Sequence, residues 1–107
     1  AEAFALAKRS GIDASKMREA LLGGFAASRV LEVHGERILK KNFVPGFKTK
    51  LFAKDLKIAA ATLADLGVAA PITAVAQQEI SARMTAGAGE EDYSGMAKVI
   101  LGLAGVE

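Results

Sequence analysis

The sequence predicts an all-α domain of about six helices. Of its 107 residues 51% are apolar, and alanine and leucine dominate among them. The alternating runs of valine, isoleucine and threonine that strands require are missing. Apolar residues recur instead at three- and four-residue spacing, between breaks that glycine and proline supply. The chain has the length of a single domain.

The first two helices are bounded by recognisable end signals. The first runs to about Arg9 and ends at Ser10 and Gly11, because glycine tolerates the left-handed conformation that closes many helices. Asp13 is expected to cap a second helix that continues to Leu22.

A third helix is expected from residue 29 to residue 41, with Ser28 as its N-cap. Gly35 lies inside this helix, where it costs about 1 kcal/mol relative to alanine. A glycine at such a position predicts that a neighbouring helix approaches closely.

The fourth helix is expected from residue 48 to residue 66, closed by Gly67, and Pro71 begins the fifth at a favoured first-turn position. One of these two should be the longest in the chain. The apolar positions available to the core on the two helices are Leu51, Leu56, Ala59, Leu63, Leu66, Ile72, Val75, Ala76, Ile80 and Met84.

The last helix should follow a flexible loop at residues 87–89. The loop is not a dinucleotide fingerprint, since no strand precedes it and a third glycine is missing. Glu90 and Glu91 are expected in solvent beside it. Asp92 or Ser94 then caps the final helix.

Composition sets limits on partners. A net charge of +2 is too slight to indicate nucleic acid, and no apolar run reaches the ~20 residues that span a bilayer. The absence of cysteine fits the cytoplasm, and one histidine, His34, cannot build a zinc site alone. We therefore expect no nucleic-acid, membrane or metal partner, and His34 is interpreted as a surface residue rather than an acid or base.

The beginning of the chain has no capping residue, and its apolar pattern is already under way at Ala1. This favours a chain that starts inside a helix. We expect it to be the C-terminal piece of a longer protein.

The most informative segment is a Pro45-Gly46 turn that leads into the fourth helix. Two aromatic residues, four lysines and one aspartate follow: Phe47, Lys48, Lys50, Phe52, Lys54, Asp55 and Lys57. Lys54 is placed two turns beyond Phe47 on nearly the same face. A cation and an acid beside an aromatic wall suit a small anionic substrate or a phosphate-bearing cofactor, although lysines at helical spacing are also typical of a solvated face.

Residues 43–47 (Phe-Val-Pro-Gly-Phe) and 54–59 (Lys-Asp-Leu-Lys-Ile-Ala) resemble the cofactor-side motif of the β-hydroxyacid dehydrogenases. Residues 22–37 are similar to the tartronate semialdehyde reductase branch of that family. A weaker third likeness is Gly87-Ala88-Gly89 followed by Asp92-Tyr93-Ser94. The resemblance covers essentially the whole chain.

The resemblance implies a fold like the C-terminal domain of 6-phosphogluconate dehydrogenase. Residues 1–107 would be the helical substrate and dimerisation domain of an NAD- or NADP-dependent enzyme that interconverts tartronate semialdehyde and glycerate. Its partners would be its own N-terminal Rossmann domain and further copies of itself. The resemblance places the family's catalytic lysine upstream of Ala1, so we expect no catalytic residue among residues 1–107 and expect this fragment alone to be inactive.

The resemblance also implies roles for three residues. Lys54 would contact the nicotinamide end of the cofactor, Phe47 would wall the substrate pocket, and Asp55 would lie at its edge. Two alternatives stay open: a 3-hydroxyisobutyrate dehydrogenase or other member of the family, and a non-catalytic helical docking module. The isolated domain is expected to expose apolar surface and to self-associate.

Overall fold

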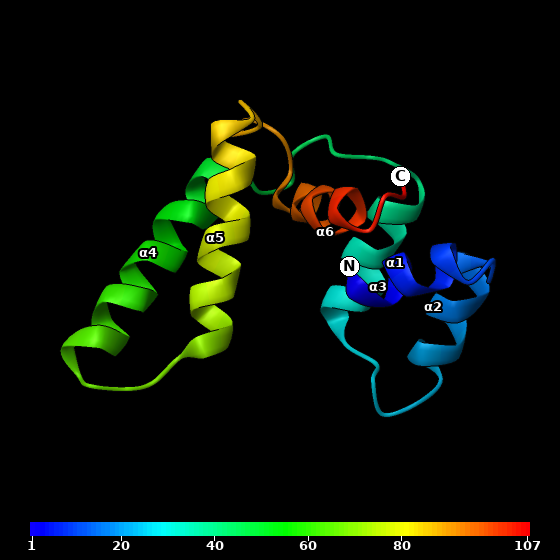
Figure 1. Cartoon of the computed structure of the whole chain (residues 1–107), viewed down its shortest axis with the longest axis horizontal. Helices are drawn as coiled ribbons and strands as arrows, with labels where there is room; N and C mark the ends of the chain where they lie inside the picture. Colours follow the sequence, from blue (N-terminus) through cyan, green and yellow to red (C-terminus); the bar gives the residue numbers. More distant parts are fainter. The chain divides into compact units, whose positions relative to one another are not determined.

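The computed structural model describes all residues from 1 to 107 and is helical throughout (Figure 1). Six α-helices and one 3₁₀ turn follow one another: α1 Glu2–Arg9, α2 Ala14–Leu22, α3 Arg29–Leu39, α4 Thr49–Asp65, α5 Pro71–Thr85, the 3₁₀ turn Tyr93–Met96, and α6 Ala97–Leu103. The only β pairing is an isolated antiparallel bridge between Lys48 and Asp92. The predicted fold class is confirmed, and α4 is the longest helix, with 17 residues.

The chain divides into two compact units. The first contains Ala1–Phe43 together with Ala97–Glu107, and the second is Val44–Met96. The first unit therefore holds α1, α2, α3 and α6, while the second holds α4, α5 and the 3₁₀ turn. None of the helices combines the length and the apolar character needed to cross a bilayer.

Most predicted helix ends are confirmed by their hydrogen bonds. Asp13 accepts from the N–H groups of Ser15 (2.8 Å) and Lys16 (3.2 Å), and Ser28 accepts from that of Leu31 (3.0 Å). These side chains satisfy N–H groups that a helix leaves free in its first turn.

The end of α3 corrects the prediction that this helix reaches Lys41. The helix stops at Leu39, and Lys41 adopts a φ of 51°, a left-handed conformation usually left to glycine. The Lys41 N–H donates to Ile38 O (3.1 Å) and the Asn42 N–H to Arg37 O (2.9 Å). This pair of bonds closes the helix, so helical periodicity alone overestimated its length.

The core of the first unit lies where α1 meets α6. Phe4, Ala5, Ala97 and Leu101 are buried there, and half-buried side chains from α2 and α3 pack around them. The predicted close approach at Gly35 is also confirmed. A Cβ at this position would lie 3.1 Å from the Arg18 side chain, which crosses from α2 and donates to Leu31 O and Glu32 O.

The second unit is a hairpin of α4 and α5 with few buried side chains (Figure 1). Thr49 is the buried residue of α4 and Ile80 that of α5. Several positions that periodicity assigned to the core are exposed instead, namely Leu51, Ala59, Leu66, Ile72, Val75 and Met84. Helical spacing identifies an apolar face, but it does not say whether a second element covers that face.

Candidate functional site

The second unit joins two segments that are far apart in sequence: the entry to α4 at residues 46–50 and the stretch at residues 89–94. The Thr49 N–H donates to Glu91 O (2.8 Å), the Lys50 N–H to Gly89 O (3.0 Å), and the Tyr93 N–H to Phe47 O (3.0 Å). No side chain caps α4. The carbonyl groups of the second segment take that place, so they fix where α4 begins.

Asp92 lies at the centre of this junction and is only 1% exposed. Its Oδ2 accepts from the N–H groups of Gly46 (2.9 Å) and Phe47 (3.2 Å). Its Oδ1 accepts from the Ser94 N–H (3.0 Å) and hydroxyl (2.6 Å). Burial by itself raises the pKa of this carboxyl, but the hydrogen bonds from Ser94, Phe47 and Gly46 outweigh it and lower the pKa to about 2. Asp92 is therefore ionised at any physiological pH.

Phe47 precedes α4 rather than lying on it, because the helix begins at Thr49. This corrects the expectation that Phe47 and Lys54 share a helical face. Phe47 is 38% exposed, and its ring meets the edge of Tyr93 with centroids 5.9 Å apart. Tyr93 in turn stacks at a tilt on Phe52, at 4.7 Å. The rings form an aromatic group whose outer member is Phe47, placed to offer an apolar face to a ligand.

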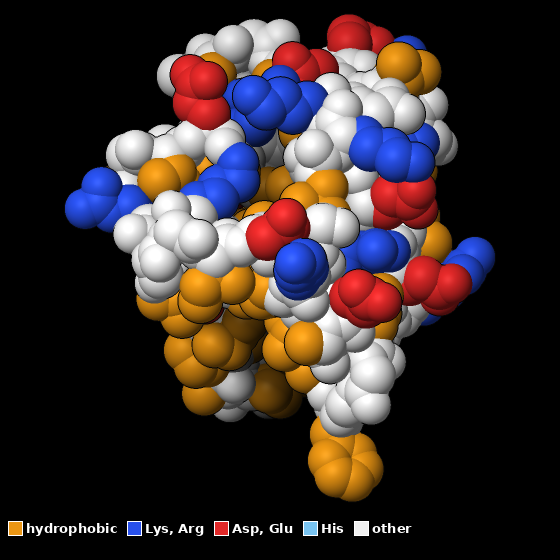
Figure 2. Space-filling model, turned by 90° about the vertical axis from the view of Figure 1, so that its right-hand side faces the viewer, with side chains coloured by type: hydrophobic (Ala, Val, Ile, Leu, Met, Phe, Trp, Pro, Cys, Tyr) orange, Lys and Arg blue, Asp and Glu red, His pale blue; other side chains and the backbone are white.

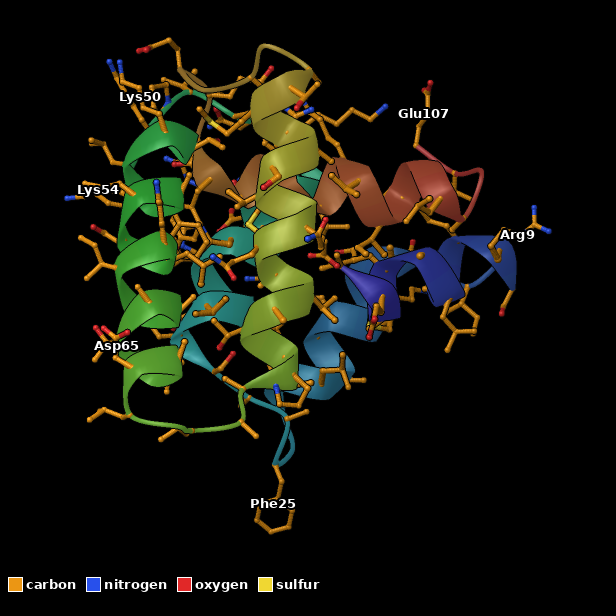
Figure 3. All side chains as sticks on the ribbon, turned by 60° about the vertical axis from the view of Figure 1, so that its left-hand side comes forward. Arg9, Phe25, Lys50, Lys54, Asp65 and Glu107 are labelled. Atoms are coloured by element: carbon orange, nitrogen blue, oxygen red, sulfur yellow. The ribbon has the colours of Figure 1, made fainter.

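Lys54 and Asp55 lie in the second turn of α4 and form an ion pair of 3.0 Å between Nζ and Oδ1. Both side chains are more than half exposed. Lys54 projects from the side of α4 that faces away from α5 (Figure 3). An ammonium group carries three donors and Asp55 occupies one of them, so Lys54 has capacity for an anionic ligand.

The other lysines of the segment are in different situations. Lys48 (2.7 Å) and Lys50 both pair with Glu90, and hydrogen bonds from these two lysines lower the pKa of Glu90 to about 2. Glu91 pairs with Arg83 at 2.6 Å. The sequence predicted that Glu90 and Glu91 only face solvent, but the structure shows that both form ion pairs. Lys57 lines a groove of about 480 Å³ between α4 and α5.

Sequence reasoning missed the importance of Asp92 and Tyr93. Asp92 followed by Ser94 was a visible signal for a local turn, because aspartate often accepts from the residue two positions later. Nothing local indicates that the same carboxylate also binds Gly46 and Phe47, which are 46 and 45 residues away.

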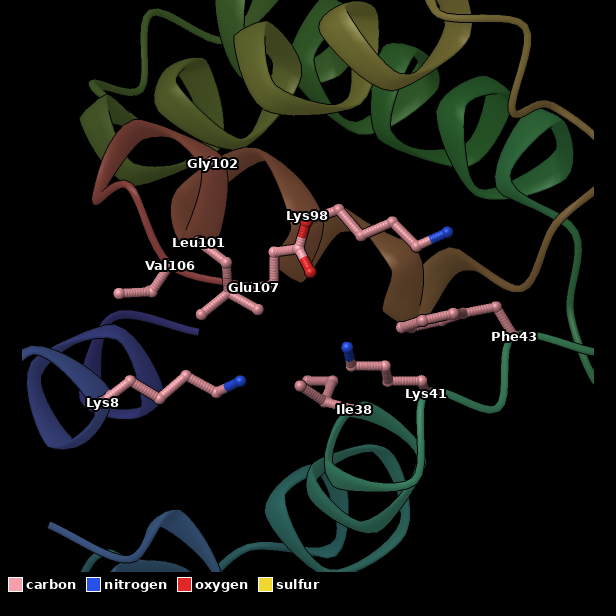
Figure 4. Close-up of a pocket in the computed structure, with 9 residues that line it drawn as sticks. All are labelled: Lys8, Ile38, Lys41, Phe43, Lys98, Leu101, Gly102, Val106 and Glu107. Carbon is pink, nitrogen blue, oxygen red and sulfur yellow. The ribbon is translucent and has the colours of Figure 1, made fainter. Parts of the chain in front are cut away.

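A separate cavity of about 310 Å³ lies within the first unit (Figure 4). Lys8, Ile38, Lys41, Phe43, Lys98, Leu101, Gly102, Val106 and Glu107 line it. The Lys98 ammonium lies 4.3 Å from the centre of the Phe43 ring. None of Phe47, Lys54 and Asp55 belongs to this unit, nor does the junction around Asp92. His34 lies on α3 in the first unit as well.

Comparison with known proteins identifies similar chains. Residues 1–100 match the model of a family described as the NAD-binding domain of NADP-dependent 3-hydroxyisobutyrate dehydrogenase. The 2-hydroxy-3-oxopropionate reductase of Escherichia coli K12 is 40% identical over 99 residues, which cover 92% of this chain and 34% of that protein. A probable mitochondrial 3-hydroxyisobutyrate dehydrogenase-like protein of Arabidopsis thaliana is 40% identical over 77 residues, which cover 72% of this chain and 23% of that protein.

Among solved structures, the 3-hydroxyisobutyrate dehydrogenase of Salmonella typhimurium superimposes with a TM-score of 0.86 at 28% identity. The match covers 92% of this chain and 34% of that one. This chain thus spans about a third of the length of the relatives that it matches.

Proposed function

This chain belongs to the family of NAD-binding domains of NADP-dependent 3-hydroxyisobutyrate dehydrogenases, and we propose that it is the helical substrate domain of a longer NAD(P)-dependent β-hydroxyacid dehydrogenase. The reaction would transfer hydride between the nicotinamide and a small semialdehyde, with 2-hydroxy-3-oxopropionate and glycerate as the preferred pair. The single observation that carries this choice is the 40% identity to the Escherichia coli reductase over 92% of the chain.

The residues at the entry to α4 and in its second turn suit this role. Lys54 offers a positive charge with free donors, as a phosphate-bearing cofactor or a carboxylate substrate requires, and Asp55 holds that charge in place. Phe47 presents an apolar ring that would exclude water from the reacting carbon. The bound dinucleotide would supply the hydride. The proton donor and the nucleotide-binding fold would belong to an N-terminal domain outside residues 1–107.

A second member of the same family is favoured by a specific observation. The solved structure with a TM-score of 0.86 is a 3-hydroxyisobutyrate dehydrogenase, and the Arabidopsis relative is named a probable 3-hydroxyisobutyrate dehydrogenase-like protein. Oxidation of 3-hydroxyisobutyrate is therefore the alternative reaction. It would use the same residues, with the apolar side of the pocket facing a methyl group instead of a hydroxyl group.

The test is an assay of the full-length protein with a panel of semialdehydes and hydroxy acids, each with NADH and NADPH or their oxidised forms. We expect 2-hydroxy-3-oxopropionate to give the highest kcat/KM. A preference for 3-hydroxyisobutyrate would select the alternative. The absence of turnover with every pair would refute an enzymatic role and favour a docking module.

The proposal includes two partners and a place in the cell. One partner is the N-terminal nucleotide-binding domain, and the other is a further copy of the protein. Exposed apolar side chains on both α4 and α5, such as Ile58 and Ile72, support the second partner. A cytoplasmic location, which the cysteine-free sequence favours, stays part of the proposal.

A further inference from the structure

We propose that Asp92 is a positioning residue for the substrate site: its buried carboxylate holds the backbone of Gly46 and Phe47 and thereby sets where the Phe47 ring stands. The inference rests on the proposed function, in which Phe47 walls the substrate pocket. Residues 89–94, which follow α5 in the sequence, would thereby determine the position of the Phe47 ring.

The two carboxylate oxygens of Asp92 accept hydrogen bonds from different parts of the chain. Oδ1 is held by the N–H and hydroxyl groups of Ser94, which fix the orientation of the carboxylate. Oδ2 is then free to accept both N–H groups of the turn. Because a carboxylate accepts with both oxygens and donates with neither, aspartate satisfies all four donors at once.

The turn depends on this contact more than an ordinary turn does. Val44, Pro45 and Gly46 are exposed, and no side chain caps the helix that follows. Pro45 fixes its own φ within the turn, and Asp92 binds the next two N–H groups, those of Gly46 and Phe47. The Phe47 carbonyl accepts from the Tyr93 N–H, so the Phe47 peptide is held on both sides.

Asp92 itself cannot reach a substrate. It is 1% exposed, and its polar atoms point at the turn and at Ser94. Any effect of Asp92 on turnover must therefore pass through the groups it holds. Tyr93, its neighbour in the chain, touches the ring of Phe47 directly, so a shift of this segment moves the ring as well.

The experiment uses the full-length protein with Asp92→Asn, and with Asp65→Asn as the matched control. An amide offers only one oxygen, so Asp92→Asn turns a donor toward either the turn or Ser94. We expect the KM for the aldehyde to rise roughly 10-fold or more while the KM for the cofactor stays within about twofold. Asp65→Asn makes the same chemical change at an exposed aspartate, the last residue of α4. We expect its aldehyde KM to stay within about threefold of the wild type.

Repeating the substitution in a Phe47→Ala background separates positioning from general destabilisation. If Asp92 acts through the ring, Asp92→Asn raises the aldehyde KM by no more than about twofold there, because the ring is already gone. Equal effects in both backgrounds would overturn the proposal, as would an unchanged aldehyde KM in the single variant. Asp92→Ser, which is smaller and keeps a short acceptor, replaces Asp92→Asn if the latter does not fold.

A second readout keeps this inference apart from the proposed function. The nuclear Overhauser contact between the Phe47 and Tyr93 rings is measured in the wild type and in Asp92→Asn. If the wild type turns over no hydroxy acid or semialdehyde, the proposed function fails, and the ring contact alone decides: its loss in the variant supports positioning, and its persistence overturns it.

Discussion

Two carboxylates of the second unit differ in how strongly they are held. Asp92 is buried and accepts four hydrogen bonds, while Asp55 is more than half exposed and has one lysine partner. Exposed ion pairs stabilise a fold by about 0–1 kcal/mol, because water screens the charges and both side chains lose freedom. The Lys54–Asp55 pair is thus more important for placing charge than for stability, whereas Asp92 contributes to the structure itself.

If the proposed function holds, Lys54→Ala should raise the KM of the full-length protein for the nicotinamide cofactor and lower its turnover. The loss of a charged contact to a bound anion costs on the order of 1–3 kcal/mol, or about a factor of 5 to 150. Lys54→Arg should recover part of it, since the charge survives. Steady-state kinetics with both coenzymes measures these effects. Lys57→Ala, one turn further along α4, is the control, and equal effects from the two lysines would contradict a specific role for Lys54.

Phe47→Ala should weaken binding of the aldehyde more than binding of the cofactor, because the ring is assigned to the substrate wall. We expect the aldehyde KM to rise roughly 10-fold, in line with the removal of an apolar wall. Phe25→Ala provides the control, since this ring protrudes fully into solvent (Figure 3). A larger change in the cofactor KM than in the aldehyde KM would reassign the residue.

The low pKa of Asp92 predicts how stability depends on pH. The folded state lowers this pKa from its usual 3.8 to about 2, so the unfolded chain takes up the proton first as the pH falls. The stabilisation is fully present above about pH 4 and is lost as the pH falls through about 2. Denaturant unfolding at a series of pH values should show this loss, and Asp92→Asn should flatten the curve in that window. The control is Asp65→Asn, at the exposed end of α4, which should keep the same dependence of stability on pH as the wild type.

At the scale of single elements, the contact between α2 and α3 depends on a missing side chain. Gly35 lets the Arg18 side chain lie across α3 and reach two carbonyl oxygens. A methyl group there would meet the middle of that side chain at 3.1 Å. The terminal guanidinium is anchored, so the side chain cannot simply swing away.

Gly35→Ala should therefore destabilise the domain by about 1 kcal/mol, despite the better helix propensity of alanine. In an Arg18→Ala background the contact at 3.1 Å is gone and only the end of the Leu31 side chain remains close, at 3.3 Å, so the same substitution should stabilise by up to about 1 kcal/mol. Chemical unfolding of the wild type, the two single variants and the double variant measures both changes in the free energy of unfolding. The same sign in the two backgrounds would show that Arg18 is not the limiting contact.

At the scale of the whole molecule, exposed apolar surface is the prominent feature. Acidic and basic side chains are interspersed on the face shown in Figure 2, with apolar side chains uncovered between and below them. In the hairpin of α4 and α5 the exposed apolar positions include Ile58, Leu66, Val68, Ile72 and Val75. Exposed apolar residues in such number usually mark an interface.

The full-length protein should therefore self-associate through this hairpin. Sedimentation velocity over a range of concentrations should show an oligomer, and Ile72→Lys on α5 should shift it toward smaller species. Leu103→Lys on α6 serves as the control because Leu103 is equally exposed, at 82% against 81% for Ile72. A wild-type protein that stays strictly monomeric at high concentration would refute this prediction.

The sequence by itself determined the helical class, the order of the helices and most of their ends. These depend on local chemistry: Asp13 and Ser28 accept from N–H groups two or three residues away, and Gly67 ends α4 with a φ of 67°. Such signals act within one helical turn, so they can be read without knowing the rest of the molecule. The family motif at residues 43–59 was visible in the same way.

The tertiary structure alone decided how the candidate site is built and which apolar faces stay uncovered. Asp92 meets Gly46 and Phe47 across 46 and 45 residues of chain, and no local pattern encodes a contact of that range. The sequence places the start of α4 near residue 48, but only the structure shows that the carbonyl groups of Gly89 and Glu91 hold that start at Thr49. Leu51 and Leu66 are exposed because periodicity marks a face as apolar, while packing decides whether anything covers it.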